Sequence, residues 1–229
     1  MNIHENFMRK CLDLAQLGQQ KTKTNPLVGC VITIDDKIIA EGYHEKFGEE
    51  HAEINAIKKI KDKSILKKAN IYINLEPCAH FGKTPPCVDA IIKYGFKLVI
   101  IGTKDPFKKV SGEAIKKLKN KTDVIVGVLE EECLVINKKF FINTIYQRPL
   151  LVLKWAESKD NFINNYNKGI TQISCEESKA LTHEWRSKLD GILVGTNTII
   201  YDNPLLTCRK VIGKNPIRIT IDRNNRLEP

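Results

Sequence analysis

Apolar positions in the first part of the chain switch between helical and strand-like spacing. Over residues 5–18 they recur at helical intervals, and Gly18 is a typical helix stop. The same reasoning predicts a succession of further elements. They are strands 28–34 and 38–43, helix 52–60, strand 70–75, helix 87–94, strand 98–102, helix 112–119, strand 123–127 and helix 130–137. This alternation predicts an α/β fold, a mixed sheet with helices on both faces.

The pattern changes near residues 146–149, where we expect a domain boundary. We therefore divide the chain into domains 1–145 and 146–229. Beyond the boundary the pattern predicts strand 150–155, a turn-rich stretch to Gly169, and a helix opened by a capping box at residues 174–177. Apolar strands follow at 191–195 and 216–222. These few elements do not complete an α/β layer, so we expect the second domain to be incomplete in this sequence.

Composition narrows the class of protein. With 42% hydrophobic and 28% charged residues, the 229-residue chain is ordinary for a soluble globular protein. The first ten residues are too polar for a signal peptide, and no apolar run approaches the roughly 18 residues of a membrane span. We expect a cytoplasmic protein with no membrane partner. Seven scattered cysteines do not suggest a disulfide framework.

The net charge of +10 comes mostly from lysine-rich runs such as residues 58–61 and 116–119. A basic surface serves either nucleic acid or a small anionic substrate. Solvated helix faces explain the same runs without any partner. We favour solvated faces and expect no nucleic-acid partner.

The most specific chemistry lies in three short stretches that contain His51, Glu53, Cys78 and Cys87. One histidine and two cysteines suit zinc, and three protein ligands leave a fourth tetrahedral position for water. Glu53, two residues after the histidine, is the expected companion of that water. The pattern H-x-E followed by P-C and a second cysteine is the signature of zinc-dependent nucleobase deaminases.

The spacing of these residues predicts their setting. Two residues apart on a regular helix, side chains point about 200° away from one another. His51 and Glu53 therefore reach one metal only if their motif opens a helix. Pro85 and Pro86 precede a predicted helix in the same way, because proline favours the first turn. A thiolate at Cys87 would be stabilised by that helix N-terminus. We expect two helix N-termini to face one zinc ion.

Two simpler interpretations compete with a catalytic zinc. One is a closed structural zinc site with His80 or Cys30 as the fourth ligand, as in a binding module that is not an enzyme. The other is a pair of buried thiols without metal. A structural site has no use for Glu53, so we favour a catalytic zinc.

The motifs also resemble a known family. Residues 24–30, 41–44, 51–53 and 75–87 resemble the bifunctional riboflavin-biosynthesis deaminase–reductase. Deaminases of tRNA or free cytosine usually have a tighter P-C-x-x-C, so the eight residues between Cys78 and Cys87 favour the riboflavin enzyme. The second part is similar to the family's reductase domain. Its matching stretches are residues 153–160, 185–186, 193–198 and 202–209.

The resemblance implies a cytidine-deaminase-like three-layer α/β/α domain, followed by the first part of a dihydrofolate-reductase-like α/β domain. It implies hydrolytic deamination of 2,5-diamino-6-(5-phosphoribosylamino)pyrimidin-4-one and NADPH-dependent reduction of the product's ribose. A nucleoside or tRNA-type deaminase remains the alternative. A nucleic-acid deaminase would need an exposed groove for a flipped base and has no evident use for a second domain. We also expect a homo-oligomer.

The resemblance assigns a role to each matching residue. His51, Cys78 and Cys87 would hold zinc, and Glu53 would carry protons in catalysis. The implied substrate contacts of the deaminase are Asn25, His44, His80, Lys83 and Thr84. In the reductase part, Ala156, Thr198 and Asp202 would line NADPH, and Arg186, Leu206 and Arg209 would bind substrate.

The chain departs from the family at several positions. Thr24 stands where many members have proline, Asn161 where many have glycine, and Gln172 where tryptophan often meets the cofactor. The family's reductase domain also continues well beyond the position of Pro229, through a Gly-rich cofactor-binding stretch. We therefore expect this chain to deaminate its substrate and to show little reductase activity.

Overall fold

The computed structural model describes residues 2–81, 85–107, 111–164 and 171–227. The chain divides into two compact units, Met1–Leu151 and Val152–Pro229, which are described separately. Within the described residues, none of the helices combines the length and apolar character needed to cross a membrane.

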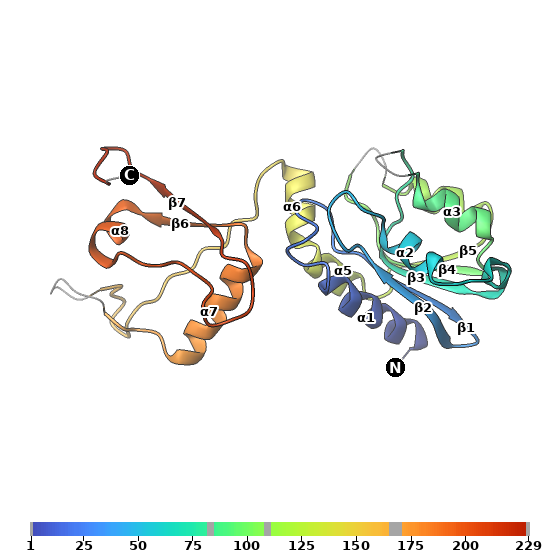
Figure 1. Ribbon diagram of the computed structural model, residues 1–229, viewed down its shortest axis with the longest axis horizontal. Helices are drawn as coiled ribbons and strands as arrows, with labels where there is room; N and C mark the ends of the chain where they lie inside the picture. Colours follow the sequence, from blue (N-terminus) through green and yellow to red (C-terminus); the bar gives the residue numbers. More distant parts are fainter. Residues whose placement is uncertain (1, 82–84, 108–110, 165–170, 228–229) are drawn as a thin grey trace. The chain divides into compact units, whose positions relative to one another are not determined.

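A five-stranded sheet forms the centre of the first unit among the described residues, with strand order β2-β1-β3-β4-β5 (Figure 1). Strand β1 pairs antiparallel with both β2 and β3, and β3, β4 and β5 run parallel. The strands are β1 (Gly29–Ile34), β2 (Lys37–Tyr43), β3 (Asn70–Leu75), β4 (Leu98–Thr103) and β5 (Asp123–Val126). The strands predicted at 28–34 and 38–43 are confirmed as the hairpin β1–β2, whose turn uses Asp35 and Asp36 with positive φ.

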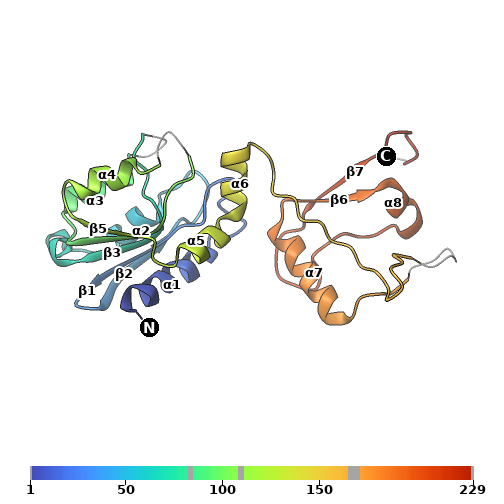
Figure 2. The same cartoon turned by 180° about the vertical axis from the view of Figure 1, so that it is seen from behind.

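Helices cover both faces of this sheet, as Figures 1 and 2 show. On one face lie α1 (Ile3–Gln16) and α5 (Glu130–Ile136). On the other lie α2 (Ala52–Lys58), α3 (Cys87–Tyr94) and α4 (Glu113–Lys119). A 3-10 helix (Lys63–Lys68) precedes β3, and α6 (Lys138–Tyr146) follows α5. The predicted three-layer α/β/α architecture is confirmed.

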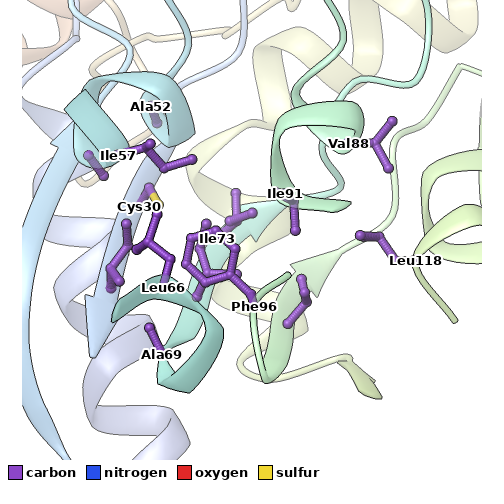
Figure 3. Packing of buried hydrophobic residues seen from close by; sticks show 14 of the residues in the cluster. Cys30, Ala52, Ile57, Leu66, Ala69, Ile73, Val88, Ile91, Phe96 and Leu118 are labelled. Atoms are coloured by element: carbon purple, nitrogen blue, oxygen red, sulfur yellow. The ribbon is translucent and has the colours of Figure 1, made fainter. Parts of the chain in front are cut away.

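Successive side chains of the central strands point to opposite faces of the sheet and pack into two separate cores. Ile71 and Ile73 of β3 pack into the core beneath α2, α3 and α4, which Figure 3 shows around Leu66 and Phe96. Tyr72, between them, packs into the opposite core with α1 and α5. All of these side chains are almost fully buried. Strands buried on both faces carry continuous apolar runs, which explains why the sequence pattern located them.

Gly42 allows α2 to lie directly against β2. A Cβ atom at this position would meet the carbonyl oxygen of Ala52 at 2.4 Å and the backbone nitrogen of Ala56 at 2.5 Å. Only glycine permits such a close approach of helix and strand. This contact fixes the first turn of α2, and therefore His51 immediately before it.

The second unit contains a parallel pair of strands, β6 (Gly191–Gly195) and β7 (Ile217–Ile221). Helix α7 (Glu176–Lys188) precedes β6, and α8 (Thr196–Asp202) follows it. Both predicted strands are present, but much of their apolar surface is exposed. Ile217 and Ile221 keep 69% and 73% of their surface accessible.

Two predictions in this unit were wrong. Residues 150–155 form no strand, because no neighbouring strand pairs with them in the described structure, and Leu153 is largely exposed. An apolar run alone cannot supply the hydrogen-bonding partner that a strand needs. The capping box at residues 174–177 is also absent. Helix α7 instead begins after Cys175, whose side chain caps no backbone N–H.

Candidate metal and catalytic site

His51, Cys78 and Cys87 converge at one point in the first unit. Their ligand atoms all lie within 4.8 Å of one another. His51 Nδ1 is 3.5 Å from Cys78 Sγ and 3.3 Å from Cys87 Sγ. Bonds of about 2.3 Å to sulfur and about 2.0 Å to nitrogen, at tetrahedral angles, place nitrogen and sulfur ligands about 3.5 Å apart. The spacing and the donor atoms therefore fit zinc.

Two of these ligands stand at helix N-termini, as predicted. His51 is the residue before α2, and Cys87 is the first residue of α3 after Pro86. Cys78 follows the carboxyl end of β3 through Pro77. Parallel strands commonly present their sites at this edge. Cys30 and His80, the alternative fourth ligands, are not part of the group that the described residues form.

One of the two thiols, Cys78, is poised to lose its proton. A hydrogen bond with Cys87, helped by His51 and by the Cys87 backbone N–H at 3.2 Å, lowers the pKa of Cys78 to about 4. The same shared hydrogen bond raises the pKa of Cys87. One negative charge therefore forms readily, and a divalent cation that displaces the shared proton would stabilise the second.

Glu53 is buried beside this group, with 2% of its surface accessible. Burial raises its pKa first, and the negative charge of Cys78 raises it further. Its position on the first turn of α2 directs it to the same cavity that His51 and Cys78 line. A carboxyl group that gains a proton easily suits a proton carrier.

A chain of hydrogen bonds fixes the orientation of Asn25. His44 Nδ1 lies 3.0 Å from the carbonyl oxygen of Glu50, which can only accept, so this nitrogen carries the proton. Burial lowers the pKa of His44, which favours the neutral ring. Its Nε2, 3.0 Å from Asn25 Nδ2, then accepts a hydrogen bond. The amide nitrogen of Asn25 is used, and its oxygen is left as the acceptor for a bound molecule.

A cavity of about 340 Å³ unites these groups. It is lined by residues from several loops and from α2, β3 and α6. They are Asn25, Pro26, Val28, His44, Phe47, Gly48, Glu49, His51, Glu53, Leu75, Glu76, Cys78, His80, Asp105 and Phe140. The predicted contacts Asn25, His44 and His80 are thus brought together with the metal ligands. Lys83 and Thr84 lie outside the described residues.

Sequence reasoning missed Glu76, Asp105 and Phe140. The buried Glu76 carboxylate accepts four backbone N–H groups, from Asp105, Gly112, Ala114 and Ile115, at 2.9 to 3.3 Å. It thereby holds the loop after β4 and the start of α4 beside the cavity. Glu76 precedes the Pro77-Cys78 motif, and this adjacency was the only signal for it in the sequence. Burial raises the pKa of Asp105.

In the second unit, the predicted substrate-binding arginines converge on Thr207. Arg186 donates to the Thr207 carbonyl oxygen at 3.2 Å, and Arg209 donates to its hydroxyl at 3.4 Å. Burial and the charge of Arg209 lower the pKa of Arg186. Leu206 is buried next to them.

The three residues predicted to contact the cofactor come from two separate segments of this unit. Thr198 and Asp202 lie one turn apart on α8. Ala156 lies instead in the extended segment 149–158.

Comparison with known proteins matches both units to protein families. Residues 1–103 match the cytidine and deoxycytidylate deaminase zinc-binding region, and residues 149–229 match the RibD C-terminal domain. The riboflavin biosynthesis protein RibD of Aquifex aeolicus is 42% identical over 222 residues, which are 96% of this chain and 62% of that protein. A diaminohydroxyphosphoribosylamino-pyrimidine deaminase of Buchnera aphidicola is 48% identical over 136 residues, covering 59% of this chain and 91% of that one.

A solved structure agrees with these matches. The diaminohydroxyphosphoribosylaminopyrimidine deaminase/5-amino-6-(5-phosphoribosylamino)uracil reductase of Thermotoga maritima superposes with a TM-score of 0.90 at 40% identity. The match covers 98% of this chain and 64% of that one. This chain thus spans less than two thirds of the length of these two-part relatives. With its zinc-binding deaminase region followed by a RibD C-terminal region, the chain belongs to the RibD family of riboflavin-biosynthesis proteins.

Proposed function

We propose that the first unit hydrolyses the 2-amino group from 2,5-diamino-6-(5-phosphoribosylamino)pyrimidin-4-one. The observation that carries this proposal is the buried Glu53 beside the His51, Cys78 and Cys87 group, within one cavity. The activities for which the Buchnera and Thermotoga relatives are named support the same substrate. A planar pyrimidine with amino groups also suits a pocket that offers the Asn25 amide oxygen as an acceptor.

Each protein group has a defined task in this reaction. Zinc held by His51, Cys78 and Cys87 would lower the pKa of water from 15.7 towards about 7, which supplies the nucleophile near neutral pH. Glu53 accepts a proton from the attacking water while the oxygen of that water bonds to the amino-bearing ring carbon. Glu53 delivers this proton to the ring nitrogen. It then takes the remaining proton from the hydroxyl group now bonded to the ring carbon and passes it to the departing amino group. The carbon–nitrogen bond breaks, and the products are ammonia and the ring carbonyl.

His44 and Asn25 would orient the pyrimidine ring in the cavity. His44, neutral and hydrogen-bonded to Glu50, keeps the Asn25 nitrogen occupied so that its oxygen faces the ring. His80, at the cavity, and Lys83 and Thr84 would contact the remainder of the substrate. We assign Lys83 to the phosphate, which a lysine meets as a point charge.

For the second unit we propose a reductase part that takes the deaminated product. Arg186 and Arg209, both at Thr207, would bind its phosphate, with Leu206 beside them. Thr198 and Asp202 on α8 and Ala156 would line NADPH. We propose a domain boundary at 145/146, which the division of the chain near Leu151 supports. We also propose that the protein is a homo-oligomer.

Ammonia release tests the proposed function. The zinc-loaded chain is incubated with the phosphoribosyl diaminopyrimidine and, separately, with cytidine and with tRNA. We expect turnover of the diaminopyrimidine alone. Release from cytidine or tRNA, with none from the diaminopyrimidine, would refute the proposal.

A further inference from the structure

Asn137 joins the end of α5 to the start of α6, outside the residues that match the deaminase zinc-binding region. It is buried, with 2% of its surface accessible. Its side chain makes a two-point pair with the backbone of Leu27. The Leu27 N–H donates to Asn137 Oδ1 at 2.8 Å, and Asn137 Nδ2 donates to the Leu27 carbonyl oxygen at 2.9 Å. These bonds span 110 residues of sequence.

A second buried asparagine completes the attachment of this loop. Asn74, on β3, donates from Nδ2 to the same Leu27 carbonyl oxygen at 3.0 Å. Its Oδ1 accepts the Gly29 N–H at 2.8 Å. Two side-chain amides thus hold the main chain of residues 27–29 from different elements. A backbone group that is partly shielded from water is destabilised when it loses such a partner, so this geometry is preferred.

The loop held in this way forms one wall of the cavity. Asn25, Pro26 and Val28 line it on either side of Leu27. Pro26 lies between Asn25 and Leu27, and its ring fixes its backbone φ angle. A displacement of the Leu27 backbone should therefore also displace Asn25. Asn25 must stay 3.0 Å from His44 Nε2 to keep its amide oriented.

The helix that follows Asn137 also reaches the cavity, through Phe140. The junction of α5 and α6 therefore holds a loop of the cavity wall through Asn137 and reaches the cavity itself through Phe140. Neither helix carries a metal ligand among the described residues.

We propose that Asn137 is a positioning residue for deamination, which holds Leu27 so that the Asn25 amide meets the pyrimidine ring. This rests on the deaminase function proposed above. Asn137 touches neither the metal ligands nor the reacting atoms in this account. Its effect passes through Asn25, and that dependence makes it testable.

The test is a double-mutant cycle on ammonia release, with Asn137→Ala, Asn25→Ala and the double variant, all loaded with zinc. We expect Asn137→Ala to bind one zinc per chain and to lower kcat/KM about tenfold or more. In the Asn25→Ala background the same change should cost less than about threefold, because contacts that act through one group are not additive.

Two further variants separate positioning from stability and volume. Tyr72→Phe removes a hydroxyl that lies 3.0 Å from His4 Nδ1, in the core that α1 and α5 cover, and should leave kcat/KM unchanged. Asn137→Asp keeps the volume but turns an acceptor towards the Leu27 carbonyl oxygen, so it should be impaired like the alanine variant.

The outcomes separate a failure of the positioning role from a failure of the proposed deaminase function. A wild-type chain that releases no ammonia refutes the deaminase function and this proposal with it. An active wild type with an unimpaired Asn137→Ala, with additive losses in the cycle, or with a fully active Asn137→Asp overturns the positioning role alone.

Discussion

At the residue scale, His183 shows how burial sets the charge of a side chain. It lies on α7 with 4% of its surface accessible. Burial lowers its pKa first, and the charges of Arg186 and Arg209 lower it further, against a hydrogen bond to the Thr207 backbone. The folded chain therefore keeps a neutral imidazole at the centre of a basic cluster.

This gives the second unit an acid sensitivity of predictable sign. The pKa of His183 is lower in the folded chain than its ordinary value of about 6.5, so below that value the unfolded chain binds a proton that the folded chain resists. Stability should fall as the pH drops through about 6.5 and further below it, until the folded chain also takes up the proton. Urea unfolding at several pH values measures it. Replacing His183 with glutamine, which can still donate to Thr207, should reduce this fall, and an unchanged pH dependence would contradict the assignment.

The candidate site was partly predictable residue by residue. His51, Glu53, Cys78 and Cys87 are recognisable because zinc chemistry restricts which residue types serve and where they stand. Glu76 and Asn137 were missed because their partners are backbone groups of distant loops. The residue type of a glutamate or an asparagine does not indicate which loop will lie beside its side chain.

At the element scale, α6 is a helix that the sequence pattern did not predict, because the predicted helix 130–137 stops where α6 begins. Its residue Phe140 lines the cavity, while the adjacent Phe141 packs against it with ring centroids 5.9 Å apart and is not part of the lining. The two half-buried rings therefore offer a matched pair of substitutions. Only the first is expected to meet the substrate.

We predict that Phe140→Leu raises KM for the diaminopyrimidine about threefold to tenfold, because an aromatic contact contributes roughly 0.5–1.5 kcal/mol. The kcat and zinc content should change little. Phe141→Leu is the control and should leave KM unaffected. Steady-state ammonia release measures both. Equal KM values for all three proteins would remove Phe140 from substrate contact.

Helices and strands could be predicted where consecutive residues of the element are buried, because such an element carries an uninterrupted apolar run. Strands β3 and β4 are buried on both faces, and their apolar runs located them within a residue. The segment 150–155 has a similar run but no strand beside it in the part of the chain that the structure describes. Strand pairing depends on residues far away in sequence, which a local pattern does not contain.

At the scale of the whole molecule, the metal ligands all belong to the first unit. Metal that binds only the folded state stabilises that state, and here it can act on one unit directly. We predict that removing zinc with a chelator speeds hydrogen exchange in β3 and β4 and leaves β6 and β7 unchanged. Mass spectrometry of peptides from each unit measures this. A uniform response, or one confined to the second unit, would contradict the assignment of the ligands.

Glu53 carries the central claim, that this site activates water for deamination. Glu53→Gln is nearly isosteric, so it should retain one zinc per chain and the same fold. Ammonia release from the phosphoribosyl diaminopyrimidine by the variant and the wild type, with zinc measured in both, is the most direct test. The account predicts a loss of about 10²–10⁴-fold in kcat, because the proton carrier is gone. Near-normal turnover by the zinc-bound variant would contradict it.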